Sequence, residues 1–112
     1  MDETNAIIKS VRVVTSEGYL TVCIELEHSR GLQEFGNFVL YRPQSHLGHN
    51  KNSCAGYFIW RVMEIVDVTD LSRIVGKTIR IRSYDGLIYS IGHIIKDMWF
   101  YPRLELDENY NG

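Results

Sequence analysis

Apolar and polar residues alternate in several stretches of this chain, as they do in strands that pack one face and expose the other. The stretches 6–14 (AIIKSVRVV) and 19–27 (YLTVCIELE) are rich in β-branched residues. The link TSEG between them contains a glycine turn signal, so the two stretches predict a β-hairpin. The packed face of the second stretch comprises Leu20, Val22, Ile24 and Leu26.

A second hairpin is predicted near the C-terminus. Segment 77–83 (KTIRIRS) alternates strictly, so its isoleucines face inward while Arg80 and Arg82 face outward. Segment 84–95 (YDGLIYSIGHII) turns at its Asp-Gly pair and returns as a strand. We therefore expect these two segments to pair with each other.

The region after the first hairpin is less regular. Segment 28–37 (HSRGLQEFGN) contains glycines and polar residues and predicts a loop. Segment 38–41 (FVLY) predicts a short strand that Pro43 closes. Residues 42–53 have no periodicity, so we expect a mobile loop there.

One main helix is predicted to begin near Cys54, with Ser53 as its cap, and to run to about Asp67. Its apolar residues at helical spacing are Phe58, Ile59, Val62, Ile65 and Val66. Thr69 is expected to cap a further short turn (DLSRIV), which Gly76 can end in a left-handed conformation.

These elements predict a single α+β domain over residues 1–112. The expected architecture is an antiparallel sheet of about five strands packed on one main helix, with a short second helix. We expect the core to span about 6–106 and residues 107–112 to form a tail. The hydrophobic fraction of 45% and the charged fraction of 23% are those of an ordinary globular protein.

Charge and cysteine content narrow the function classes. The net charge of -2 creates no overall field that would gather nucleic acid. Cys23 and Cys54 lie in different predicted elements, unlike the dense disulfides of small secreted domains, so we expect reduced thiols in the cytosol. No apolar run approaches the roughly eighteen residues of a membrane span, and no phosphate-loop or dinucleotide motif occurs. We expect no membrane association and no cofactor.

Two candidates for metal or nucleophilic chemistry involve Cys54. His46, His49 and Cys54 could bind zinc, but they do not make a full tetrahedral ligand set, and a solvated loop is the alternative that we favour. Cys54 at a helix N-terminus could also be an activated nucleophile. The simpler interpretation is a buried, inert cysteine.

The C-terminal hairpin and the residues after it form the remaining candidate. Arg80 and Arg82 project from one strand face, and the chain then leads into Lys96, Trp99 and Phe100. Guanidinium groups can bind phosphate, and aromatic rings can stack on a base, so this combination suits a nucleotide. The alternative is a solvated arginine face with both aromatic residues in the core.

Gly92 interrupts the last predicted strand and should mark a bulge or a close backbone approach. His93 would then be turned toward Lys96 and Asp97 as a polar corner, although a hydrogen-bonded structural histidine is the commoner case. The full set of candidate ligand-binding residues is Arg61, Arg80, Arg82, His93, Lys96, Asp97, Trp99 and Phe100. No catalytic or metal-binding residue is assigned.

Three motifs, GLQEFGNFVLY, CAGYFIWRVMEIVDVTDLSRIVGKTIRIRS and SIGHIIKDMWFYP, resemble a family of small proteins encoded by bacteriophages and mobile elements. The resemblance covers about residues 7–106, and its IGHIxKDxWFxP ending is the most specific part. The chain departs from the family pattern at Asn37, where a glycine is expected, and at Asp67, where a small residue is expected.

The resemblance implies an accessory protein that acts in the host cytoplasm. The sequence pattern is similar to that of counter-defence sponges, which are proteins that sequester the cyclic ADP-ribose signal of Thoeris immunity. Such a sponge needs cationic and aromatic groups on rigid strands and no catalytic machinery.

Three function classes stay open. The first is a non-enzymatic, homo-oligomeric protein that sequesters a nucleotide-like signal. The second is an inhibitor that binds a host defence protein, such as a CRISPR effector, through Trp60 or Trp99. The third is a small enzyme that uses His93 with Asp97, or Cys54. A ligand pocket predicts aromatic and cationic groups together, whereas a protein interface predicts exposed aromatic residues away from the cations.

Overall fold

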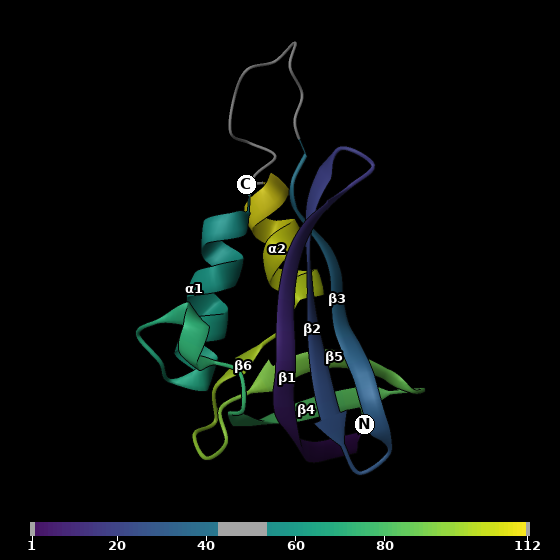
Figure 1. Ribbon diagram of the computed structural model, residues 1–112, viewed down its shortest axis with the longest axis vertical. Helices are drawn as coiled ribbons and strands as arrows, with labels where there is room; N and C mark the ends of the chain where they lie inside the picture. Colours follow the sequence, from purple (N-terminus) through teal and green to yellow (C-terminus); the bar gives the residue numbers. More distant parts are fainter. Residues whose placement is uncertain (1, 43–53, 112) are drawn as a thin grey trace.

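The computed structural model describes residues 2–42 and 54–111, with the side chains of 107–111 excepted (Figure 1). Apart from Arg42, the loop predicted at 42–53 lies outside the described residues, as do the predicted cap Ser53 and both His46 and His49. The described residues form a fold of the predicted α+β type, with one antiparallel sheet and two α-helices.

The sheet has six strands in the order β3-β2-β1-β4-β5-β6, one more strand than predicted. The strands are β1 (Asp2–Ser16), β2 (Tyr19–His28), β3 (Gly31–Tyr41), β4 (Thr78–Tyr84), β5 (Leu87–Gly92) and β6 (Trp99–Phe100). The two predicted hairpins are therefore present as β1–β2 and β4–β5.

Strand β1 joins the two hairpins into one sheet. Its residues from Ile7 onward pair with β2, and its first residues, Asp2 to Ile7, pair with β4. Figure 1 shows the long strands β1, β2 and β3 standing across β4 and β5, so the sheet is strongly bent. Gln33 Nε2 in β3 donates a hydrogen bond of 2.6 Å to the carbonyl of Gly86, in the turn between β4 and β5.

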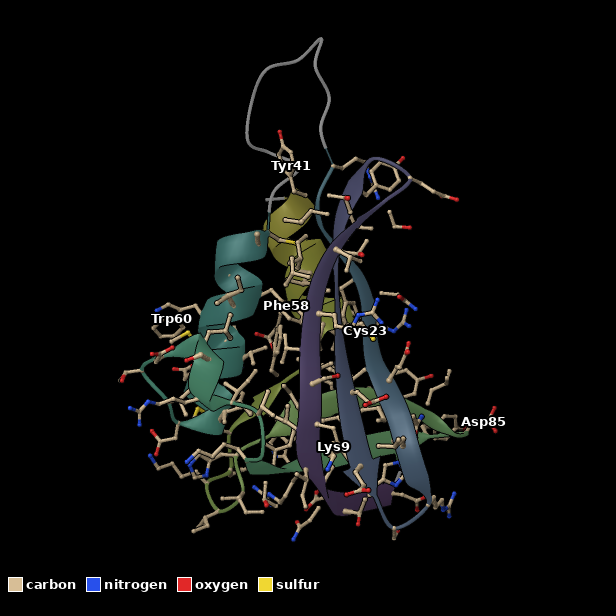
Figure 2. The ribbon with its side chains drawn as sticks, in the orientation of Figure 1. Lys9, Cys23, Tyr41, Phe58, Trp60 and Asp85 are labelled. Carbon is tan, nitrogen blue, oxygen red and sulfur yellow. The ribbon has the colours of Figure 1, made fainter. Side chains whose placement is uncertain are left out.

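Helix α1 (Ala55–Val66) packs inside the bend of the sheet, and the predicted apolar stripe is confirmed at its centre. Phe58, Val62 and Ile65 are buried against the strands, and Figure 2 shows Phe58 between the helix and the sheet. The helix ends at Asp67, as predicted, in the left-handed conformation with φ of 66°.

A short 3-10 helix (Leu71–Arg73) follows α1 where the sequence predicted a further turn. Its cap is Asp70, whose side chain accepts the Ser72 amide, so the prediction that Thr69 is the cap was wrong. Gly76 adopts the left-handed conformation expected of it, with φ of 89°.

The predicted loop at 28–37 was wrong, because β3 begins at Gly31. Gly36 lies at an irregularity of the β2–β3 pairing, where an added Cβ would stand 2.5 Å from the Cys23 Cα. Close backbone contact at a bulge excludes a side chain there. The polar composition that indicated a loop is that of an edge strand.

The C-terminal region also differs from its prediction. Strand β5 ends at Gly92, so Ile94 and Ile95 are not strand residues as predicted. The chain instead forms a loop and returns as β6, and helix α2 (Pro102–Asn111) follows where a tail was predicted from residue 107. Within the described residues, neither helix has the length and apolarity needed to cross a membrane.

Candidate functional site

The segment His93–Met98 is a tight loop that connects β5 to β6. The His93 amide donates to the Met98 carbonyl at 3.0 Å, and the Met98 amide donates to the Lys96 carbonyl at 2.8 Å. These bonds reverse the chain so that Trp99 pairs with Gly92. Backbone bonds within the loop thus set the position of β6.

His93 stabilises this loop from inside. Its side chain is buried, and Nδ1 accepts the amides of Ile95 and Lys96, both at 3.0 Å. Its other ring nitrogen, Nε2, lies 3.9 Å from an Asp67 carboxylate oxygen. All these contacts of His93 are internal to the fold.

Arg80 ties the same loop to strand β4. Its guanidinium donates to the carbonyls of His93 at 2.7 Å and Lys96 at 2.6 Å. Arg82, two residues further along the same face, donates to the Tyr101 hydroxyl at 2.7 Å. The outward direction predicted for both arginines is confirmed, because the alternating Ile79 and Ile81 are buried.

Trp99 lies beside both guanidinium groups. The Arg82 Cζ is 3.6 Å from the indole centroid and the Arg80 Cζ is 4.8 Å away, so both arginines make cation–π contacts. Gly92 permits this arrangement, since an added Cβ there would be 2.5–2.7 Å from the indole ring. The predicted close approach at Gly92 is confirmed, while the irregular pairing of β4 with β5 lies at Arg82–Ser83.

Glu3, which the sequence analysis missed, completes this group. It stands opposite Arg82 in the β1–β4 register, and its two oxygens lie 3.3 Å from Arg80 Nη1 and 3.2 Å from Arg82 Nε. We call Glu3, Arg80, Arg82 and Trp99 the arginine–tryptophan cluster. Only the pairing of two distant strands places Glu3 there, and no local motif indicates it.

The cluster is partly open to solvent and positively charged. Side-chain exposure is 21% for Arg80, 27% for Arg82 and 41% for Glu3. Lys96 and Asp97 are exposed at its margin, and the Asp97 carboxylate accepts the Trp99 indole N–H at 3.2 Å. These side chains together carry an excess of one positive charge.

The other two candidate residues, Arg61 and Phe100, lie on the helix side of β6. Phe100 is fully buried, so it is a core residue, a choice that the sequence left open. Arg61 donates to the Trp99 carbonyl at 2.6 Å and to Glu105 at 2.9 Å, and it also pairs with Glu64. Arg61 therefore reaches only the backbone of Trp99, from the side of β6 opposite the side chains of the arginine–tryptophan cluster.

Glu105 in the first turn of α2 is the centre of this inner network. It accepts the Tyr57 hydroxyl at 2.6 Å and the Tyr101 amide at 2.8 Å, besides Arg61. Burial alone would raise the pKa of Glu105, but the hydrogen bonds outweigh it and hold the pKa below its ordinary value. Pro102 at the start of a helix, with an acid soon after, is the sequence signal that could have predicted α2.

The surroundings of both cysteines disfavour the thiolate form. Cys54 is buried and its Sγ donates to the Val39 carbonyl at 3.3 Å, and burial raises its pKa. Burial, with Glu34 nearby, raises the pKa of Cys23 to about 11. In the described part of the chain, no three His, Cys, Asp or Glu side chains gather as a metal site would need.

A second surface lies on the outside of α1. Trp60 is 63% exposed, and Figure 2 shows it pointing away from the sheet. It borders a shallow groove lined by Trp60, Met63, Glu64, Val68 and Thr69. Aromatic and cationic groups lie together in the arginine–tryptophan cluster, as expected for a ligand site. An exposed aromatic residue lies away from that cluster on α1, as expected for a protein interface.

Replacing Gly92 with alanine should displace Trp99. The added methyl group would overlap the indole, and such overpacking costs about 1–3 kcal/mol of unfolding free energy. Urea unfolding followed by circular dichroism would measure the loss. Gly56→Ala is the matched control, because an added Cβ there meets nothing and alanine favours the helix by about 0.5–1 kcal/mol. An unchanged stability of Gly92→Ala would contradict the close contact.

Glu105→Gln should lower stability at pH 7 by about 1–3 kcal/mol, since the hydrogen bonds to the charged carboxylate weaken. The folded-state pKa of Glu105 is depressed, so its contribution is present above the ordinary value of 4.5 and is lost as the pH falls through the folded value. Urea unfolding at pH 7, 5 and 3 should show a flatter profile for Glu105→Gln. Glu17→Gln, at an exposed position, is the control. If the stability of Glu105→Gln depended on pH as that of the wild type or of Glu17→Gln does, this role of Glu105 would be contradicted.

Comparison of the chain with protein families, curated proteins and solved structures gives no match.

Proposed function

We propose that this is a non-catalytic binding protein that captures a nucleotide-type ligand on the outer face of β4, β5 and β6. The observation that supports the proposal is the convergence of Arg80 and Arg82 on Trp99, at 4.8 and 3.6 Å. Two guanidinium groups beside one aromatic ring combine the chemistry that phosphate and base require. Lys96 at the margin adds a further exposed cation.

The contacts suggest how the parts of such a ligand would bind. Arg82 stacks on the indole, so a base would stack against this guanidinium–indole pair. Arg80 is held by two loop carbonyls and would offer its remaining N–H groups to phosphate. The ligand would therefore meet a face whose side chains are already oriented, which lowers the entropy cost of binding.

Sequestration without turnover fits the contacts of the residues that could serve catalysis. His93 uses Nδ1 to accept two backbone amides, so that nitrogen is not available as a base. The raised pKa of Cys54 disfavours a thiolate nucleophile. Asp97 is engaged with the Trp99 indole.

The proposed biological setting is counter-defence in a bacteriophage-infected host, where the protein would act as a sponge for an immune signal. The resemblance of the SIGHIIKDMWFYP ending to phage proteins supports this setting. We further propose a homo-oligomer in the host cytoplasm, because β3 is a long edge strand that a second copy could cover.

Isothermal titration with ADP, cyclic ADP-ribose and cyclic di-GMP tests the proposal. At least one of these should bind, raise Tm by several degrees and be recovered intact after heat denaturation. Arg82→Gln should weaken that binding by about tenfold or more, as expected for loss of a charge-assisted hydrogen bond. Arg12→Gln is the control, because Arg12 is an exposed arginine of β1 and its substitution changes the net charge equally. Failure of all three ligands to bind, or their cleavage, would refute the proposal.

A second candidate is direct inhibition of a host defence protein through the Trp60 groove. The 63% exposure of Trp60 favours it, since exposed tryptophans are frequent anchors of protein interfaces. The groove is distinct from the arginine–tryptophan cluster in its residues and its element. The two candidates therefore make separable predictions.

Trp60→Ala should change the free energy of unfolding by no more than about 0.5 kcal/mol, because the side chain is mostly exposed. If the second candidate is correct, this variant will lose protection of phage in defence-competent cells, while Arg82→Gln will keep it. The opposite pattern would support ligand sequestration and exclude the Trp60 groove as the active surface. Plaque counts on cells with and without the defence system would measure both variants.

A further inference from the structure

The arginine–tryptophan cluster contains two kinds of contact. The arginines make short bonds of 2.6–2.7 Å to the carbonyls of His93 and Lys96 and to the Tyr101 hydroxyl. Their contacts with Glu3 are longer, at 3.2 and 3.3 Å, although these join opposite charges, which usually approach to about 2.7–2.9 Å. The guanidinium groups are thus oriented chiefly by the loop and Tyr101.

Glu3 is the most replaceable member of the cluster. Its side chain is 41% exposed, more than either arginine, and an ion pair this open to water contributes little to stability. A change of side-chain rotamer would release the carboxylate without breaking the pairing of β1 with β4, which uses backbone groups. The short bonds that hold Arg80 and Arg82 would remain.

The Glu3 carboxylate lies where a bound phosphate could contact both arginines. One oxygen faces Arg80 Nη1 and the other faces Arg82 Nε, so a single anion bridges the two guanidinium groups. A phosphate offers a comparable pair of oxygens and more negative charge than a carboxylate. Guanidinium groups bind such oxygen pairs in two-point contacts.

We propose that Glu3 occupies the phosphate subsite of the ligand-free protein, and that a phosphate bridging Arg80 and Arg82 displaces it. This inference rests on the proposed function and assigns the ligand class more closely, to molecules with a phosphate or diphosphate group. Glu3 then has two effects: it offsets the repulsion between the arginines without ligand, and it competes with the ligand for them. Weakening this competitor should strengthen binding.

Titration of wild type, Glu3→Gln and Asp2→Asn with inorganic pyrophosphate and with ADP tests the inference. Asp2 is the control, because its neutralisation changes the net charge equally while its side chain lies on the opposite face of β1. Glu3→Gln should bind about tenfold more tightly than the wild type, with a lower Tm in the absence of ligand. Asp2→Asn should change the affinity by less than about twofold. Glu3→Asp, whose shorter side chain cannot bridge both arginines as well, should fall between the wild type and Glu3→Gln.

The possible results separate the inference from the proposed function. If the wild type binds, Arg82→Gln weakens binding by about tenfold or more, and Glu3→Gln binds no more tightly than Asp2→Asn, then Glu3 has only a structural role and the inference is overturned. If neither the wild type nor Glu3→Gln binds either probe or the nucleotides named above, the proposed function fails as well. Tighter binding to Glu3→Gln than to Asp2→Asn, with the order of the three Glu3 side chains as stated, supports the inference.

Discussion

The contact between Trp99 and Gly92 is the constraint on which the C-terminal half of the fold depends. Because Gly92 has no side chain, the indole can lie against β5 at a distance that no other residue would permit. This position brings Trp99 beside Arg80 and Arg82 on the outer face. It also directs the next residue, Phe100, into the core, where it packs edge-on against Phe58.

Two arginine–carboxylate networks lie on opposite sides of β6, and their burial differs. On the helix side, Arg61 and Glu105 have side-chain exposures of 15% and 22%, with short bonds that tie α1, β6 and α2 together. On the outer side, Glu3 is 41% exposed and its bonds are longer. A buried network with short hydrogen bonds stabilises the fold. A solvent-exposed network with longer hydrogen bonds can exchange one of its partners. This difference supports the proposal that a ligand binds on the outer face.

The sequence predicted the features that depend on local periodicity. Alternation of apolar and polar residues indicated the outward direction of Arg80 and Arg82, and helical spacing indicated the buried face of α1. The close approach at Gly92 followed from a glycine within a strand. Glu3 could not be predicted, because its place depends on the register between strands separated by more than seventy residues.

The failures have equally specific causes. Ile94 and Ile95 look like strand residues, but His93 accepts two amides of its own loop and so ends the strand. Asn37 and Asp67 both have positive φ, at 64° and 66°. Asn and Asp tolerate this conformation better than other residues with a side chain. At both positions the backbone conformation accounts for the residue type better than any chemical role does.

The loop after β5 links fold and proposed function, because Arg80 serves both. Two nitrogens of the Arg80 guanidinium donate to the loop carbonyls of His93 and Lys96, and the third faces Glu3. A ligand that competes only with Glu3 would leave the loop bonds intact, so binding would add contacts without unfolding β6. A ligand that had to displace the loop carbonyls would release the loop and with it Trp99. Because Arg80 has both kinds of partner, the contacts favour a ligand that replaces Glu3 and leaves the loop and Trp99 in place.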